Sequence, residues 1–143
     1  MKKITLFLLF IATYAHAQKS EVFSSSKGAV EGYDVVAYFT EGKPVEGAKT
    51  YTTKWKGEDW FFSSQANRDL FLASPEKYEP QYGGYCAFGM SRGYKAKTDP
   101  QAWTILDGKL YLNYNRDVQV EWAKDTKGYI EKANKNWPTV KSN

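Results

Sequence analysis

Polar and hydrophobic positions alternate in two stretches of the chain, and each stretch predicts a β-hairpin. The first spans residues 50–62, where aromatic and β-branched side chains alternate with polar ones around a turn at Gly57. The second spans residues 103–114 and turns at Asp107-Gly108, a dipeptide typical of two-residue hairpin loops. The chain therefore contains at least two predicted antiparallel strand pairs.

Helical patterns follow each hairpin. The predicted helices span residues 65–73, 75–78, 115–124 and 129–137. Ser63 or Ser64 can cap the first helix, Pro75 suits the first turn of the second, and Pro138 ends the last, which Gly128 precedes. Because hairpins and helices are segregated, we expect an α+β domain, with one small antiparallel sheet made of both hairpins and helices packed on one face.

Two further segments complete the predicted domain organisation. Residues 33–39 form an aromatic and β-branched run that fits a buried strand, whereas residues 18–30 are polar, serine-rich and without period, which predicts a loosely ordered lead-in. We therefore expect a single domain over residues 31–138 and a short tail over residues 139–143.

Residues 1–17 have the pattern of a signal peptide. Lys2 and Lys3 precede an apolar run over residues 4–12, and Ala15-His16-Ala17 provides a small-x-small cleavage site before Gln18. A buried N-terminal helix is the alternative. The signal peptide predicts a periplasmic or secreted protein with no transmembrane anchor after cleavage, because no later apolar run is long enough to span a membrane.

Cleavage also limits the chemistry. His16 is the only histidine, so the mature chain lacks the Ser-His and Cys-His pairs of common hydrolases, histidine metal ligands and a histidine pH switch. Loss of Lys2 and Lys3 leaves 18 basic against 16 acidic residues and a net charge of +2, without the basic stripe of a nucleic-acid-binding protein. We therefore expect a non-enzymatic protein whose partner is another protein or a small ligand, not nucleic acid.

The two hairpin and helix units resemble each other. Each unit carries Asn-Arg-Asp near its predicted helix start, at residues 67–69 and 115–117, and a glycine at its hairpin turn. An internal repeat and shared local chemistry are both consistent with these matches.

The only cysteine, Cys86, lies in a segment rich in glycine and aromatic residues. Three interpretations of its thiol are open: a packed structural side chain, a soft-metal ligand acting with Met90, and a redox-active thiol whose pKa nearby cations lower. Those cations are Arg92, Lys95 and Lys97. The candidate loop or ligand residues around the thiol are Tyr82, Gly83, Gly84, Tyr85 and Phe88. Asp34, in the predicted buried run, is a further candidate, with a turn or cap role as its alternative.

Four motifs in chain order resemble the exported bacterial branch of the YHS-domain family. They are Gly-Tyr-Asp-Val-Val-Ala-Tyr-Phe at residues 32–39, Trp-Phe-Phe-Ser-Ser-Gln-Ala-Asn-Arg-Asp-Leu-Phe at residues 60–71, Pro-Glu-Lys-Tyr at residues 75–78, and Tyr-Gly-Gly-Tyr-Cys-Ala at residues 82–87. The resemblance implies a compact α+β domain in a group associated with metals, with copper-handling relatives.

The chain departs from this resemblance at the metal ligands. Positions that hold cysteine in metal-binding relatives fall on Ser63 and Asn67, and an earlier one falls near Ala37. The fold therefore carries over, whereas the usual metal site does not. Our leading hypothesis is an exported binding module that handles a soft metal such as copper through Cys86 and Met90. The alternatives are a thiol redox protein using Cys86 and an aromatic interaction domain with a structural cysteine.

Overall fold

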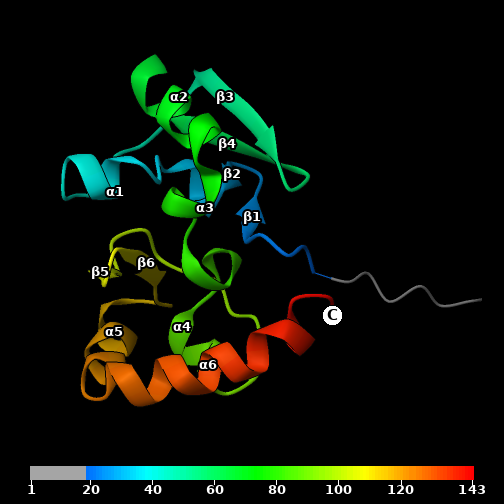
Figure 1. Ribbon diagram of the computed structural model, residues 1–143, viewed down its shortest axis with the longest axis vertical. Coiled ribbons are helices and arrows are strands. Elements are labelled where there is room, and N and C mark those ends of the chain that lie inside the picture. Colours follow the sequence, from blue (N-terminus) through cyan, green and yellow to red (C-terminus); the bar gives the residue numbers. More distant parts are fainter. Residues whose placement is uncertain (1–18) are drawn as a thin grey trace, which may run out of the picture.

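The computed structural model describes residues 19–143 and shows an α+β fold, as predicted. The predicted signal peptide lies outside the described residues. Within residues 19–143, no helix is both long and apolar enough to span a membrane. Figure 1 shows two halves arranged along the long axis, with β1–β4 and α1–α3 in one half and β5, β6 and α4–α6 in the other.

The first half consists of two hairpins and three helices. Its elements are β1 (Ser24–Ser25), β2 (Gly28–Ala29), the 3₁₀ turn η1 (Val30–Gly32), α1 (Ala37–Thr40), β3 (Ala48–Trp55), β4 (Glu58–Phe62), α2 (Gln65–Ala73) and α3 (Pro75–Tyr78). The long hairpin pairs Trp55 with Glu58 around the predicted turn. The Ser64 side chain accepts a hydrogen bond from the Asn67 N–H and so caps α2, as expected.

The second half has the same kinds of element. It contains η2 (Gln81–Gly84), α4 (Ala87–Ser91), β5 (Trp103–Leu106), β6 (Lys109–Leu112), α5 (Arg116–Ala123) and α6 (Thr126–Val140). The second predicted hairpin is confirmed, with Leu106 paired to Lys109, and Asn115 caps α5. Figure 1 shows α6 running along the end of this half, beneath α4 and α5.

The two long hairpins do not join into one sheet, so that part of the predicted architecture is wrong. Strands β1–β2, β3–β4 and β5–β6 form three separate two-stranded sheets. Strand β6 instead makes one isolated parallel β-bridge, between Leu110 and Pro80, with the segment that follows α3. A proline lacks the N–H needed to extend a strand ladder, which limits this contact to one bridge.

Residues 33–39 are not a strand, which is a second correction. Tyr33 makes one bridge to Glu46, and the chain then turns into α1. The carboxylate of Asp34 accepts hydrogen bonds from the N–H groups of Val36 and Ala37, at 2.9 and 3.1 Å, and so starts the helix. A short fully buried apolar run has no period that distinguishes strand from helix.

The serine-rich segment is packed and not loosely ordered. Val22 and Ala29 are each 1% exposed, and β1 pairs with β2. Pattern analysis missed this because the segment buries only isolated side chains. The last helix also differs, since α6 begins at Thr126 behind the cap Asp125 and continues past Pro138 to Val140. Pro138 has no N–H to donate to the carbonyl of Asn134, four residues earlier. Because Asn134 is exposed, water can donate to this carbonyl instead.

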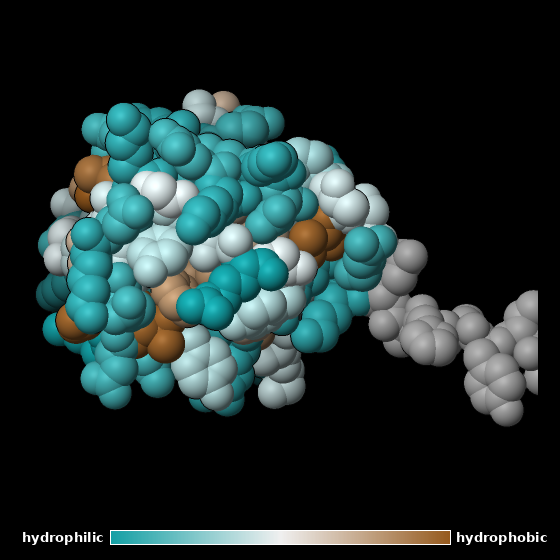
Figure 2. All heavy atoms as spheres, turned by 90° about the horizontal axis from the view of Figure 1, so that it is seen from below, coloured by the Kyte–Doolittle hydropathy of each residue, from teal (hydrophilic) through white to brown (hydrophobic). Residues whose placement is uncertain are grey.

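Residues 19–143 form two hydrophobic cores, and the first also contains Leu110 and Leu112 of β6 from the second half. The first core is largely aromatic and includes Trp60, Phe62 and Phe71. The ring centroids of Trp60 and Phe62 each lie 5.1 Å from that of Phe71. The core of the second half gathers Met90 and Trp122 against α6. The surface over this end, seen from below in Figure 2, is largely hydrophilic with small separate hydrophobic spots.

Candidate functional site

Cys86 lies at the start of α4 and is 1% exposed. Its sulfur accepts a hydrogen bond from the Gly89 N–H at 3.4 Å, and its thiol donates to Oδ1 of Asn113 at 3.5 Å. Burial raises the pKa of the thiol, while the backbone N–H groups of Gly89, Tyr114 and Phe88 oppose the rise. The resting thiol is thus a neutral helix cap, which fits the structural interpretation best.

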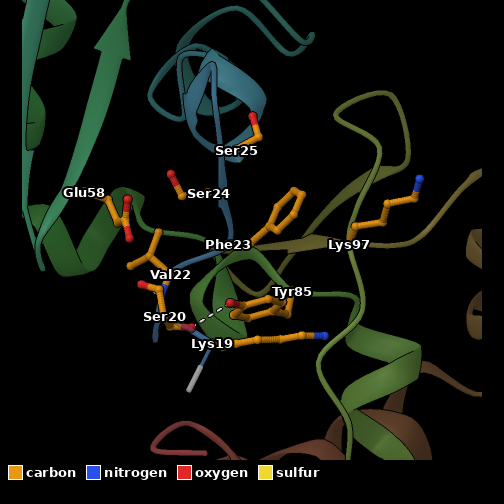
Figure 3. A pocket seen from close by; sticks show the side chains of 9 residues that line it. All are labelled: Lys19, Ser20, Val22, Phe23, Ser24, Ser25, Glu58, Tyr85 and Lys97. Atoms are coloured by element: carbon orange, nitrogen blue, oxygen red, sulfur yellow. Dashed lines mark hydrogen bonds between the residues drawn. The ribbon is translucent and has the colours of Figure 1, made fainter. Parts of the chain in front are cut away.

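The other residues of the predicted loop are placed around this cap without forming one pocket. Met90 lies one helical turn after Cys86 and is fully buried in the second core. Gly83 approaches the backbone of Glu21, and Gly84 packs against Val30. Phe88 packs on Tyr129, Tyr82 donates to Asn134, and Tyr85 points to the carbonyl of Ser20, before β1 (Figure 3). Gly83, Gly84 and Tyr85 thus contact the first half, whereas Tyr82, Phe88 and Met90 pack within the second.

Asp34 is the centre of a second buried polar cluster. Its side chain is inaccessible to solvent. In addition to the α1 N–H groups, it accepts hydrogen bonds from the Ser63 N–H at 2.8 Å, the Ser63 hydroxyl at 2.7 Å and the Asn67 amide at 2.8 Å. These contacts bring the strand β4, helix α2 and helix α1 together at one carboxylate, so the cap role expected for Asp34 is accompanied by a tertiary one.

The family positions for cysteine therefore meet in space. Ala37, Ser63 and Asn67 all donate hydrogen bonds to Asp34. Together they provide four donors to one carboxylate, the Val36 N–H adds a fifth, and none of these groups is a thiolate. Because the oxygens of Asp34 are already occupied by these donors, the cluster does not fit a soft metal ion. Among residues 19–143, moreover, no group of three or more histidine, cysteine, aspartate or glutamate side chains is arranged to hold a metal ion.

A cavity lies at the junction of the two halves. Its volume is about 500 Å³, and its walls come from the N-terminal segment, β4 and the loop before β5. The lining residues are Lys19, Ser20, Val22, Phe23, Ser24, Ser25, Glu58, Tyr85 and Lys97. Figure 3 shows the rings of Phe23 and Tyr85 side by side between Glu58 on one side and Lys97 on the other.

The two rings are held in place. Their centroids are 5.7 Å apart, and the Tyr85 hydroxyl donates to the carbonyl of Ser20 at 2.6 Å. Burial raises the pKa of Tyr85, with a contribution from Glu58, so the phenol keeps its proton at neutral pH. Two lysines, Lys19 and Lys97, outnumber the single carboxylate of Glu58 in this cavity. The site therefore offers a rigid aromatic surface, and the charged side chains that line it have a net positive charge.

Of the residues that line this cavity, only Tyr85 was a candidate ligand residue from the sequence. Phe23 and the serines of β1 lie in the segment expected to be a loosely ordered lead-in, and Lys97 was considered only as a neighbour of the thiol. The sole available signal was Phe23, an isolated aromatic residue in a serine-rich stretch. A single ring has no period, so its tertiary partner could not be inferred.

Comparison with known proteins agrees with the resemblance. The family model of the YHS domain matches residues 36–82. The comparison with curated proteins and the comparison with solved structures gave no match. The matched segment runs from the start of α1 to η2 and so contains Ala37, Ser63 and Asn67. The chain therefore carries a YHS domain over residues 36–82.

Proposed function

We propose that this protein is an exported, non-enzymatic binding module that holds a small anionic ligand with an aromatic or apolar body in the Phe23–Tyr85 cavity. The observation that carries the proposal is the pair of fixed rings beside Lys97 in a cavity of about 500 Å³. That volume is within the range typical of small-molecule sites. Export rests on the signal peptide pattern, and membership of a family compatible with metal handling comes from the YHS match.

Charge and shape define the ligand class. The ammonium of Lys97 also lies 5.6 Å from the Tyr114 ring centroid, at the border with a neighbouring cavity of about 430 Å³. An anionic group beside Lys97 would be attracted electrostatically, while a planar body could stack on Phe23. The hydroxyls of Ser24 and Ser25 supply further hydrogen-bonding groups at the edge of the cavity.

The test is a calorimetric titration of residues 18–143 with 4-hydroxybenzoate as the probe. We expect saturable binding that weakens with added salt, and a loss of affinity of about tenfold in both Phe23→Ala and Lys97→Ala. Lys109→Ala, an exposed lysine on β6 away from the cavity lining, is the matched control and should bind like the parent. Absence of binding, or equal affinity in all three variants, contradicts the proposal.

A second candidate function is soft-metal handling by Cys86 and Met90. Its support is that the Gly89 N–H donates to the Cys86 sulfur, that the N–H groups of Gly89, Tyr114 and Phe88 oppose the rise in its pKa, and that Met90 supplies a thioether one helical turn later. Thiolate and thioether are the ligand types that select Cu(I), and a bound metal deprotonates its thiol. Under anaerobic conditions, competition with a Cu(I) chelator should then give one bound ion per chain. Equal copper affinity in Cys86→Ser contradicts this candidate.

Disulfide exchange, one form of the redox alternative, requires a thiol that is ionised and accessible to a second thiol, and the geometry favours neither. A cycling thiol must meet its disulfide partner in the folded protein, whereas Cys86 is buried and its pKa is raised. We therefore expect iodoacetamide to alkylate Cys86 at least about a hundredfold more slowly in the folded protein than in urea. Equal rates would restore the redox alternative.

A further inference from the structure

The two halves of the chain repeat one backbone design. Each half begins with a turn in which three consecutive residues have positive φ, and the values match in order. They are 52°, 56° and 79° at Val30, Glu31 and Gly32, and 58°, 63° and 87° at Tyr82, Gly83 and Gly84. Such a run is uncommon outside glycine. In both halves the next residue is tyrosine, followed by Asp34 in the first half and Cys86 in the second.

The hydrogen bonds around these two residues also match. The N–H of Asp34 donates to the carbonyl of Val45 at 2.8 Å, and the N–H of Cys86 donates to that of Ala96 at 3.0 Å. The side chain of each residue then accepts hydrogen bonds from N–H groups at the start of a short helix, α1 or α4, and a hairpin with a two-residue turn follows. Figure 1 shows the two sets of elements as the two halves of the molecule.

The helices after the hairpins fix the register of the repeat. Ser64 caps α2 and Asn115 caps α5, and each cap is followed seven residues later by a buried aromatic residue, Phe71 or Trp122. The Asn-Arg-Asp triplets are therefore not equivalent, because Asn67 is the third residue of its helix whereas Asn115 is a cap. The structure therefore supports the internal repeat through the equivalent caps Ser64 and Asn115, and not through the Asn-Arg-Asp triplets.

In this register, Cys86 takes the place of Asp34. Asp34 accepts from the N–H groups two and three residues later and from that of Ser63, the residue before the α2 cap. The Cys86 sulfur accepts from the Gly89 N–H, three residues later, at 3.4 Å. The N–H of Phe88, two residues later, donates to Oδ1 of the neighbouring Asn113, and the N–H of Tyr114, the residue before the α5 cap, lowers the pKa of the thiol. The backbone that holds a carboxylate in the first half is thus present around the thiol in the second.

A separate observation shows an unused donor at the same place. Asn113 is completely buried, and its Oδ1 accepts from both the Cys86 thiol and the Phe88 N–H. Its Nδ2 is buried and has no acceptor among the described residues. A buried amide donor without a partner costs free energy, and an added oxygen acceptor next to Cys86 would remove that cost. Rotation of the Asn113 amide would direct Nδ2 toward such an oxygen.

We propose that Cys86 is a site of oxidation by hydrogen peroxide, and that the backbone around it holds the resulting sulfinate as the first half holds the carboxylate of Asp34. A sulfinate has two oxygens on the sulfur, as a carboxylate has two on its carbon, so Cys86 sulfinate presents two anionic oxygens one atom beyond Cβ as aspartate does, on a pyramidal instead of a planar centre. This inference depends on the repeat and on Asn113, and not on ligand binding in the Phe23–Tyr85 cavity.

The chemistry proceeds in two balanced steps. The thiolate attacks one peroxide oxygen, an S–O bond forms, the O–O bond breaks, and the leaving hydroxide takes up a proton to become water. A second peroxide reacts with the sulfenate in the same way and gives the sulfinate and another water. In each step sulfur loses two electrons and peroxide gains them. The thiol must first lose its proton to solvent, and its burial and raised pKa keep the thiolate fraction small, so the reaction is slow. It does not require a protein partner.

Substitution tests the anion site directly. Cys86→Asp should fold with a melting temperature within about 5 °C of the parent, because its carboxylate finds the same N–H donors that Asp34 finds. Ala133→Asp is the matched control, since Ala133 is equally buried but lies in the apolar second core, and it should melt at least about 15 °C lower or fail to fold. Equal destabilisation of both variants overturns the proposal.

Peroxide treatment tests the modification. The folded parent should gain about 32 Da, two oxygens, that peptide mapping assigns to Cys86, and the modified protein should keep its melting temperature. Cys86→Ala should gain no oxygen in this peptide apart from any on Met90, which mapping separates. Absence of oxidation in the folded protein overturns the proposal, as does a sulfinate form that melts at least about 10 °C below the parent.

Discussion

The Asp34 carboxylate accepts hydrogen bonds from both the backbone N–H and the hydroxyl of Ser63, at 2.8 and 2.7 Å. This pair fixes the end of β4 against the start of α1, two elements that are far apart in the sequence. In the chain, the polar cluster occupies the positions at which metal-binding relatives are expected to carry cysteine. The cluster therefore performs by hydrogen bonding a connection that a metal ion could otherwise provide.

Asp34→Ala should destabilise the protein by roughly 3 kcal/mol or more, because it leaves several buried donors without an acceptor. Urea unfolding, followed by tryptophan fluorescence, measures the change. Asp69→Ala, at an exposed position on α2, is the control and should cost less than about 0.5 kcal/mol. A loss below about 1 kcal/mol in Asp34→Ala would show that the cluster is not a main connection between these elements.

Gly83 should be far less tolerant of alanine than Gly57. Both glycines have positive φ, at 63° and 77°, so both substitutions strain the backbone. A Cβ at residue 83 would overlap the carbonyl oxygen of Glu21, whereas a Cβ at residue 57 would meet no atom within 4 Å. We expect Gly83→Ala to cost at least about 2 kcal/mol more in chemical unfolding. Similar losses in the two variants would mean that the N-terminal segment moves away from Gly83 without cost.

Stability should fall at alkaline pH. Burial raises the pKa of Tyr38, Tyr82, Tyr111 and Cys86, so these groups keep their protons in the folded protein after they have lost them in the unfolded chain. The stability is therefore complete below the unfolded pKa values, about 8.5 for cysteine and 10 for tyrosine, and decreases above them.

Urea unfolding between pH 8 and 11 measures this decrease, which approaches about 1.4 kcal/mol per pH unit for each group that titrates only on unfolding. Tyr38→Phe removes one such group, together with its hydrogen bond to the carbonyl of Pro100. The variant should be less stable at neutral pH and show a shallower alkaline slope. An unchanged slope would indicate that Tyr38 ionises in the folded state.

Lys95 should hold the two ends of the described chain together. Its ammonium donates to the carbonyls of Lys19, Lys141 and Asn143, at 3.0, 3.0 and 2.9 Å. Lys95→Met keeps most of the side-chain length but none of these bonds. We expect faster amide hydrogen exchange after Pro138 and a stability loss of about 1–3 kcal/mol. Lys135→Met, on the exposed side of α6, is the control, and equal exchange in both variants would contradict this role.

The sequence pattern predicted the local elements well because their causes are local. Both long hairpins have two-residue turns containing glycine, and α2 has a side-chain cap, so neighbouring residues determine them. The separation of the hairpins into different sheets could not be predicted, because pairing between strands depends on contacts across the chain. The buried run at residues 33–39 failed for a related reason, since the side chain of Asp34 and not hydrophobic periodicity decides its conformation.

For the candidate sites, too, residues could be selected from the sequence, whereas their distant partners could not. Cys86 and Asp34 could be selected from the sequence because a lone thiol and a carboxylate in an apolar run are unusual. Their roles could not, because the partners Asn113 and Ser63 lie 27 and 29 residues away. The cavity was missed because Phe23 meets Tyr85 only in the folded chain.

The most direct test of the proposed binding function is a ¹H–¹⁵N NMR titration of residues 18–143 with 4-hydroxybenzoate. The account predicts saturable shifts at the backbone amides of Phe23, Tyr85 and Lys97, with smaller effects at distant positions such as Lys109. It also predicts that Lys97→Ala weakens these shifts at equal probe concentration. Shifts confined to another surface, or none at any of the cavity residues, would contradict the claim that this cavity is the binding site.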